Sequence, residues 1–367
     1  GGIVITSSHN DVMWNGLKFV ERDEGLFVSP EKCEKLFALA DSGKYEYATY
    51  DKMGTISHVS SALNEHIDAV LSLKYIDTNL IRQKKYKVCL DSVNGAGGPI
   101  MKHLLEKLGC QVIGLNLEPT GMFAHKPEPI PEHLGSLCES VKKENADIGI
   151  AVDPDVDRCV LIDNHGNPLG EEYTLALAVK FYLTQCGKTT VCKNLSTTRA
   201  VDDVCKQYGV ELYAAAVGEI NVAKRMVEVG SRIGGEGNGG VMLADIHIGR
   251  DAVVAAVLTL QHLSIFGGTI SQLKQSLPQY EIVKLKAPVA GIDADAVVNH
   301  FKKEWSGKAT LNDVDGLHIS TSDWWVHLRK SNTEPIIRVI GEAAGGKAKS
   351  QEICDKFLND ILQISKQ

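Results

Sequence analysis

Short apolar runs alternate with longer amphipathic segments through the middle of the chain. A continuous apolar run closed by Gly, Pro, Asn or Asp is typical of a buried strand, whereas the longer segments have the length and apolar spacing of helices. This alternation predicts a β-α-β-α-β unit built on a mostly parallel, layered sheet. In this unit we predict strands at residues 86–90, 111–115 and 148–152 and helices at residues 99–108 and 132–145.

The same alternation continues to residue 280 and then changes. Residues 281–367 combine short strands with paired turns, which predicts an antiparallel sheet with helices, an α+β arrangement. In the first part of the chain, Ser29 as an N-cap followed by Pro30 marks the start of a helix. The other predicted elements are strands at 3–5, 189–193 and 211–215 and helices at 60–73, 170–186, 199–208, 221–229 and 252–266.

These patterns predict an α/β protein made of consecutive domains. A length of 367 residues is too great for one compact core and favours two to four domains. A polar run at residues 82–85 marks the first expected boundary. We therefore expect three α/β domains with mixed sheets and a C-terminal α+β domain. Their expected bounds are 1–84, 85–187, 188–280 and 281–367.

The composition narrows the class of partner. The chain is 44% hydrophobic and 23% charged, which is ordinary for a soluble protein, and its net charge of −7 gives no basic footprint for nucleic acid. No apolar run approaches a membrane span, and we recognise no signal peptide. Nine scattered cysteines without a CxxC pair are typical of a reducing cytoplasm, where we expect this protein. We expect small-molecule partners, while the oligomeric state stays open.

An acidic stretch contains Asp153, Asp155 and Asp157 between two apolar runs. Side-chain alternation along an extended segment would place these carboxylates on one face, and converging hard oxygens suit Mg²⁺ or Ca²⁺. An EF-hand is excluded, because Arg158 stands where the turn glycine belongs and Asn164 where the closing glutamate belongs. The alternative interpretation of this stretch taken alone is a solvated acidic turn.

Three further polar stretches are candidates for chemistry. Ser8 and His9 follow the strand at 3–5, and a serine hydroxyl beside a histidine is a candidate nucleophile or phosphate carrier. Glu236 and Asn238 lie among five glycines, where backbone approaches a ligand closely and both side chains can bind hydroxyl groups. Taken singly, each is also explained as an ordinary turn. The third stretch combines hydroxyls with the guanidinium groups of Arg329 and Arg338, which are good phosphate receptors, or is a polar hairpin with surface charge.

In chain order these four stretches resemble the signatures of the α-D-phosphohexomutase family, which includes phosphoglucomutase/phosphomannomutase and phosphoglucosamine mutase. The resemblance covers the whole chain and implies four domains around a central cleft, the last similar to the TATA-box-binding protein. It also implies that an N-terminal piece precedes this chain, which has no initiator methionine. The four stretches are Ser8-His9-Asn10, Asp153-x-Asp155-x-Asp157-Arg158, Gly235-Glu236-Gly237-Asn238-Gly239 and Arg329-x-Ser331-Asn332-Thr333-Glu334-Pro335.

The resemblance implies an isomerase, an intramolecular phosphotransferase that interconverts hexose 1-phosphate and hexose 6-phosphate. Its implied cofactors are Mg²⁺ and hexose 1,6-bisphosphate, the latter as activator and intermediate. Ser8 is implied as the phosphorylated residue. The other implied roles are metal binding by Ser8, Asp153, Asp155 and Asp157, catalysis by His9, Lys18 and Arg158, and substrate binding by Glu236, Asn238, Arg329, Ser331, Asn332, Thr333 and Arg338.

Several positions depart from the family pattern. Ser7 replaces an alanine and is a competing phosphorylation site, and Ala216 stands where many members have a lysine. The group that transfers protons is therefore open among Lys18, Lys193 and His9. The preferred hexose is also open. A rival interpretation is a non-catalytic or regulatory sugar-phosphate-binding protein on the same fold.

Overall fold

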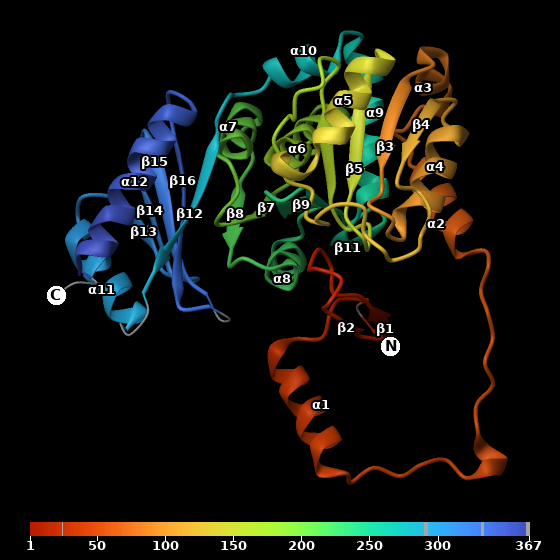
Figure 1. Cartoon of the computed structure of the whole chain (residues 1–367), viewed down its shortest axis with the longest axis horizontal. Helices are drawn as coiled ribbons and strands as arrows, with labels where there is room; N and C mark the ends of the chain where they lie inside the picture. Colours follow the sequence, from red (N-terminus) through yellow and green to blue (C-terminus); the bar gives the residue numbers. More distant parts are fainter. Residues whose placement is uncertain (24, 290–292, 332–333, 365–367) are drawn as a thin grey trace.

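The computed structural model describes the whole chain except residues 24, 290–292, 332–333 and 365–367 (Figure 1). Its strands form four sheets that follow one another along the chain. In Figure 1 the second and third sheets lie together, the fourth sheet lies at one end, and the first lies below the third.

The first sheet is an antiparallel hairpin of β1 and β2. Helix α1 begins as predicted, because the Ser29 hydroxyl accepts a hydrogen bond from the backbone N–H of Lys32 and Pro30 lies in the first turn. Every residue of α1 is at least partly exposed, and α1 stands apart from the sheets (Figure 1). The elements are β1 (Gly2–Ile5), β2 (Leu17–Val20), α1 (Pro30–Ser42), η1 (Tyr50–Lys52), α2 (Ala62–Leu71) and α3 (Thr78–Lys84).

The second sheet has the strand order β4-β3-β5-β6. Strand β3 is parallel to both β4 and β5, and β6 is antiparallel to β5. Every residue of β5 and β6 is buried, which explains their continuous apolar runs. The elements are β3 (Lys87–Asp91), α4 (Gly97–Lys107), β4 (Gln111–Leu115), η2 (Pro131–His133), α5 (Gly135–Glu144), β5 (Ile148–Val152) and β6 (Cys159–Ile162).

The third sheet has the order β11-β10-β9-β7-β8, with β7 parallel to β8 and β9. Strands β9, β10 and β11 form an antiparallel meander. The elements are α6 (Glu172–Gln185), β7 (Val191–Asn194), α7 (Arg199–Tyr208), β8 (Leu212–Ala215), α8 (Glu219–Val229), β9 (Ile233–Glu236), β10 (Gly240–Leu243), β11 (His247–Arg250), α9 (Ala252–Phe266) and α10 (Ile270–Gln275).

The fourth sheet is wholly antiparallel, with the order β12-β16-β15-β14-β13. Its own hydrophobic core contains Phe301 and Phe357 from the two helices that pack on it. The elements are β12 (Ile282–Pro288), α11 (Ala294–Trp305), β13 (Thr310–Asn312), β14 (Leu317–Ser320), β15 (Trp324–Lys330), β16 (Ile336–Ala343) and α12 (Lys347–Ile364).

Helix α9 joins the second and third sheets into one packed body. It is apolar on all sides, as expected of a helix with neighbours on every face, and is buried from Ala252 to Ser264. A single hydrophobic core contains Leu90 and Ile150 of the second sheet, Val241 of the third and Leu258 of α9. The loops at the ends of both sheets are therefore held by one core.

The predicted multi-domain α/β architecture is confirmed, including the antiparallel C-terminal part. The predicted strand at 111–115 and the helices at 199–208 and 252–266 coincide with β4, α7 and α9. Elements that were not predicted include α3, which contains part of the polar run at 82–85, and β11, whose His, Gly and Arg residues lack a strand pattern but pair with β10. Among the described residues, no helix combines the length and apolar character needed to cross a membrane.

Candidate active site

The acidic loop, residues 153–158, joins β5 to β6 and brings three carboxylates to one point. Asp153, Asp155 and Asp157, here called the aspartate triad, each place an oxygen within 4.8 Å of the others. The alternation of an extended strand does not cause this convergence, contrary to our expectation. Val156 has a left-handed backbone (φ 64°), and the loop wraps around Asp153, whose Oδ1 accepts the backbone N–H groups of Asp157 and Arg158, both at 3.0 Å.

Each aspartate of the triad uses one oxygen for hydrogen bonds and leaves the other without one, although Arg158 Nε lies 3.8 Å from both Asp153 Oδ2 and Asp157 Oδ1. Asp155 Oδ2 accepts from Thr6 Oγ1 at 3.1 Å and Lys18 Nζ at 2.8 Å. Asp157 Oδ2 accepts from Lys18 Nζ at 3.2 Å and Arg250 Nη2 at 2.6 Å. The triad's buried oxygens without a hydrogen-bond partner among the described residues are Asp153 Oδ2, Asp155 Oδ1 and Asp157 Oδ1. Three unpaired carboxylate oxygens at one point fit a hard divalent cation.

The charges around the triad are unevenly compensated. Burial, with Asp157 and Asp155 close by, raises the pKa of Asp153 well above its usual range. Burial also opposes ionisation of Asp157, but the positive charges of Arg250, Lys18 and Arg158 outweigh it and bring the pKa of Asp157 to about 2. A divalent cation among the three oxygens would remove the remaining repulsion between these carboxylates.

A turn that contains Gly95 and Ala96 packs against the acidic loop. The backbone N–H of Ala96 donates to the carbonyl of Pro154 at 2.8 Å. A Cβ atom on Gly95 would lie 2.5 Å from the Pro154 Cα, so only glycine allows this approach. Gly95 therefore has a packing role beside the triad.

The serine loop, residues 6–10, lies directly against the acidic loop. Thr6 Oγ1 donates to Asp155 Oδ2 and accepts the backbone N–H of Ser8 at 2.8 Å, so one hydroxyl connects the two loops. Ser8 has a left-handed backbone (φ 54°), which is uncommon outside glycine and fixes the direction of its side chain. Ser7 also lines the adjoining cleft of about 460 Å³, but its hydroxyl accepts from Asn10.

His9 connects Ser8 to Arg158. Its Nδ1 lies 3.2 Å from Ser8 Oγ and 2.9 Å from Arg158 Nη2. A guanidinium only donates hydrogen bonds, so Nδ1 accepts and carries no proton. Burial and the Arg158 charge lower the pKa of His9 to about 4, which keeps the ring neutral near neutral pH. His9 therefore presents a proton-free Nδ1, whose lone pair accepts from Arg158, within hydrogen-bond distance of the Ser8 hydroxyl.

The two candidate lysines differ sharply in position. Lys18 bridges Asp155 and Asp157; although burial lowers its pKa, these two carboxylates outweigh that effect and leave the pKa raised, so Lys18 is a cation. Lys193 donates to the carbonyls of Thr197 and Thr198, both at 3.1 Å, which directly precede α7. It also pairs with Asp202, which lies within α7. Lys193 thus secures the start of α7, whereas Lys18 belongs to the triad.

Glu236 ends β9 in the glycine loop, residues 234–241, and is almost fully buried. Its Oε1 accepts from Asn194 Nδ2 at 2.8 Å and the Gly218 N–H at 2.9 Å, and its Oε2 accepts from Arg250 Nη1 at 2.7 Å. Asn238 is half-buried and donates weakly to Glu236 Oε2 at 3.5 Å. Glu236 is therefore already a structural acceptor before any sugar binds.

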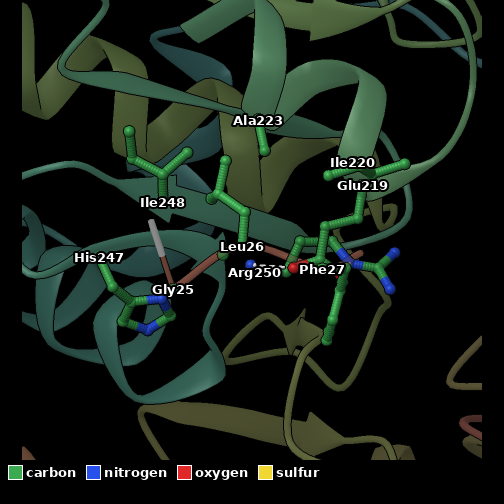
Figure 2. Close-up of a pocket in the computed structure, with 10 residues that line it drawn as sticks. Gly25, Leu26, Phe27, Glu219, Ile220, Ala223, His247, Ile248 and Arg250 are labelled. Carbon is green, nitrogen blue, oxygen red and sulfur yellow. Dashed lines mark hydrogen bonds and ion pairs between the residues drawn. The ribbon is translucent and has the colours of Figure 1, made fainter. Parts of the chain in front are cut away.

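Arg250 links loops that are distant in sequence, and sequence reasoning missed this role. Its guanidinium pairs with Asp157, with Glu236 and, through Nε at 3.3 Å, with Glu219 of α8. A Cβ atom on Gly240 would lie 2.2 Å from Arg250 Cδ, so this glycine gives the arginine room to cross β10. Glu219 and Arg250 line a pocket together with residues 25–27 (Figure 2). In the sequence, Arg250 was visible only as a residue shortly before the helix at 252–266.

Replacing Arg250 by leucine is expected to lower the free energy of unfolding by about 3–5 kcal/mol, because it leaves buried carboxylates without their cation. Chemical denaturation followed by circular dichroism measures this change. The control is Arg225→Leu, which removes an exposed pair with Glu228 and is expected to cost no more than about 1 kcal/mol. Equal losses in both variants would contradict the bridging role.

The predicted phosphate segment, residues 329–335, is not joined to the triad by the described contacts. Arg329 Nε pairs with Asp315 Oδ2 at 2.7 Å, and this oxygen also accepts the backbone N–H of Val217 at 2.9 Å. Arg338 lies opposite Arg329 in the β15–β16 ladder and is exposed. Ser331 is half-buried, whereas the predicted contacts of Asn332 and Thr333 lie outside the described residues.

Comparison with known proteins agrees with this architecture. The family described as phosphoglucomutase/phosphomannomutase matches through its alpha/beta/alpha domain II at residues 64–166 and its domain III at residues 170–280. A probable phosphoglucosamine mutase of Methanopyrus kandleri is 32% identical over 369 residues, covering 98% of this chain and 78% of that protein. A phosphoglucomutase/phosphomannomutase of Thermococcus kodakarensis is 33% identical over 360 residues, covering 98% and 77%.

Solved structures show the same fold. A phosphoglucomutase/phosphomannomutase family protein of Burkholderia thailandensis superposes with a TM-score of 0.84 at 22% identity, covering 99% of this chain and 76% of that one. N-acetylphosphoglucosamine mutase of Aspergillus fumigatus, solved with GlcNAc-6P and magnesium, superposes with a TM-score of 0.65 at 14% identity, covering 100% and 89%. With two family domains matched and relatives above 30% identity along nearly the whole chain, this protein belongs to the phosphohexomutase family of mutases.

Proposed function

We propose that the protein interconverts hexose 1-phosphate and hexose 6-phosphate through a phosphoserine at Ser8 and a hexose 1,6-bisphosphate intermediate. The observation that carries this proposal is the attachment of the serine loop, through Thr6, to a triad with three unpaired buried oxygens. A phosphorylatable hydroxyl beside a divalent-cation site is what phosphoryl transfer requires. Membership of the family supports the same reaction.

We propose that the triad, together with an oxygen of the phosphorylated Ser8, would bind Mg²⁺. The support is a donor set made only of carboxylate oxygens, which suits Mg²⁺, and the magnesium in the solved Aspergillus fumigatus mutase. When bound, Mg²⁺ supplies positive charge to the oxygens of the transferring phosphoryl group.

The side chains around Ser8 divide the remaining work. In the proposed reaction the bond between Ser8 Oγ and phosphorus breaks as the free hydroxyl of the hexose monophosphate forms its bond to phosphorus. The proton that this hydroxyl loses balances the proton that Ser8 Oγ gains. The bisphosphate turns over and returns its other phosphoryl group to Ser8. Lys18 and Arg158 add positive charge, and His9, whose Nδ1 faces Ser8 Oγ, is the group that we assign to proton transfer at the serine.

We propose that Asn238 and the remaining acceptor capacity of Glu236 bind sugar hydroxyls. Glu236 already has protein partners on both oxygens, so Asn238 is the freer of the two side chains. The two relatives are named for different sugars, phosphoglucosamine in one and phosphoglucose with phosphomannose in the other. We therefore leave all three hexose phosphates as candidate substrates.

The four expected domains would each supply one stretch to a common cleft. We keep the bounds 1–84, 85–187, 188–280 and 281–367 as a proposal. In it, Arg329, Ser331, Asn332, Thr333 and Arg338 hold the phosphate that does not react. A grip remote from the reacting centre supplies alignment through binding energy.

We also propose a cytoplasmic location, which the nine free cysteines support.

Replacing Arg329 by alanine is expected to raise KM by about 10- to 100-fold for every phosphosugar, because a charge-assisted hydrogen bond to the shared phosphate is lost. The substrate phosphate must displace Asp315 from Arg329, so Asp315→Asn is expected to lower KM. Steady-state kinetics with glucose, mannose and glucosamine phosphates measure both effects. Lys330→Ala, the adjacent exposed residue paired with Asp295, is the matched control. A change confined to one sugar would contradict a phosphate grip.

The test of the proposed function is intact mass followed by peptide mapping of the purified protein. A phosphate on Ser8 that disappears on incubation with hexose monophosphate, together with turnover that depends on glucose 1,6-bisphosphate and Mg²⁺, is the expected result. The rival is a non-catalytic or regulatory sugar-phosphate-binding protein, to which Ala216 in place of the usual lysine gives some support. That rival predicts binding of hexose phosphates with no phosphate on Ser8 and none acquired from the bisphosphate.

A further inference from the structure

A second group of possible metal ligands lies outside the candidate active site. His66 of α2 and His247 of β11 both direct Nε2 at the same oxygen, Asp251 Oδ2, at 2.7 Å and 2.9 Å. These ligand atoms come from segments that are about 180 residues apart in sequence, since 247 − 66 = 181. Among the described residues, no hydrogen bond or ion pair joins this group to the oxygen-only triad, and its donor set is different: two imidazoles and one carboxylate.

The carboxylate of this group is held in place by the fold. Asp251 is the N-cap of α9, and its Oδ1 accepts the backbone N–H groups of Val253 at 2.8 Å and Val254 at 3.1 Å. Its side chain is only 7% exposed, whereas His66 is 28% and His247 47% exposed. One rigid ligand therefore faces two rings that have freedom to turn, and one side of the group is open to solvent.

We infer that His66, His247 and Asp251 form a binding site for a transition-metal cation of the Zn²⁺ type. Two histidines and one carboxylate, with a fourth position open to water, are a recurrent Zn²⁺ ligand set, and imidazole disfavours Mg²⁺. At Zn–ligand distances of about 2.0–2.1 Å, neighbouring ligands are roughly 3.3 Å apart. Small outward rotations of the two exposed rings reach this spacing from the present 2.7 and 2.9 Å.

The exchange of protons for metal is balanced. Without metal, each ring must carry a proton on Nε2 to donate to the single acceptor oxygen. On binding, Zn²⁺ takes the Nε2 lone pair of both rings: a neutral ring moves its proton from Nε2 to Nδ1, and a doubly protonated ring releases its Nε2 proton to solvent. The hydrogen bonds to Asp251 Oδ1 remain and orient the carboxylate, as groups around metal ligands generally do.

The position of this site suggests what the metal would do. A metal ion bound there would connect α2, which precedes the second sheet in the chain, to β11 of the third sheet and to the first residue before α9. Asp251 directly follows Arg250, whose guanidinium joins Asp157 to Glu236. His247 also lines the pocket beside Arg250, on the opposite side from Glu219 (Figure 2). A bound metal would therefore stabilise the packing of α2, β11 and α9 next to Arg250, and it would not take part in the reaction.

The test is Zn²⁺ titration of the full chain by calorimetry in a buffer with excess Mg²⁺, which occupies the triad. We expect one Zn²⁺ per chain, with at least tenfold weaker binding in His66→Gln and His247→Gln. Glutamine keeps an N–H donor for Asp251 but is a poor Zn²⁺ ligand, so these variants separate metal binding from hydrogen bonding. His58→Gln, at an exposed histidine outside the group, is the matched control and is expected to bind like the parent.

Co²⁺ provides a second readout that discriminates between sites. In a site of two imidazoles and one carboxylate with low coordination number it gives strong visible absorption, whereas six oxygen ligands give weak bands. We expect the strong bands in the parent and in His58→Gln, and their loss in His66→Gln and His247→Gln. Zn²⁺ affinity and Co²⁺ spectra that are identical in the parent and both glutamine variants would overturn the inference, as would the absence of any Zn²⁺ binding.

Discussion

Ser8→Ala is expected to abolish mutase turnover, with a loss of at least about 10³-fold in kcat, as is typical when a covalent nucleophile is removed. The fold is expected to persist, because Ser8 lies in a loop and its side chain contacts only His9 among the described hydrogen bonds. The contact that holds the serine loop to the acidic loop runs through Thr6 and the Ser8 backbone N–H, which the variant keeps.

Ser7→Ala is the matched control for this prediction. Ser7 and Ser8 line the same cleft, but the hydroxyl of Ser7 bonds Asn10, while that of Ser8 faces the His9 nitrogen. Coupled assays of hexose 1-phosphate conversion and mass spectrometry of the loop peptide measure activity and phosphate together. We expect Ser7→Ala to stay phosphorylated and active. Full turnover by Ser8→Ala would remove Ser8 from the mechanism, and inactivity of Ser7→Ala with a phosphate-free loop would transfer the role to Ser7.

The fold could be predicted from local patterns where burial imposes them. Helix α7 coincides with its prediction because it has a periodic apolar pattern, and α9 because it is a long, continuously apolar segment. Both begin at a clear N-cap, Thr198 and Asp251. Strand β11 was missed because its residues are polar, and its extended conformation depends on pairing with β10. Pairing across a sheet is a tertiary effect that a single segment does not encode.

The candidate site was predictable as a set of stretches but not as a geometry. The triad, Ser8, His9, Lys18 and Arg158 were identified, and the described contacts bring them together. Thr6 and Arg250 were missed, because each contacts an aspartate of the triad that lies more than ninety residues away in the chain. Nothing in the local sequence around such a residue specifies which partner folding will bring to it.

The reason for the triad's convergence also differs from the sequence argument. Strand alternation correctly predicted that the three aspartates lie together, but it is not the reason that they do. The acidic loop turns at Val156, and the backbone N–H groups of Asp157 and Arg158 donate to Asp153. Asp153 thus stabilises the turn of the loop from inside, and Asp155 is the member of the triad that contacts the serine loop. This division makes Asp155 the most informative aspartate to change, because its replacement leaves the turn intact.

Asp155→Asn is expected to weaken Mg²⁺ binding and to lower kcat by about 10²–10³-fold, the scale of loss seen when one preorganised electrostatic group is removed. Asparagine retains an oxygen that accepts from Thr6 but replaces a charged ligand oxygen with a neutral amide. It also leaves Lys18 with one carboxylate partner, Asp157, in place of two. The loss should therefore combine a weaker cation site with a displaced lysine.

These two causes can be separated by titration. If the cation site is the main cause, raising Mg²⁺ should restore part of the activity of Asp155→Asn, and the activity at saturation should report the contribution of Lys18. Asp163→Asn, whose carboxylate only accepts hydrogen bonds in the turn after β6, is the control and should keep the Mg²⁺ dependence of the parent. Parent-like activity of Asp155→Asn in the presence of a chelator would mean that the triad holds no catalytic metal, and its unpaired oxygens would then need another partner.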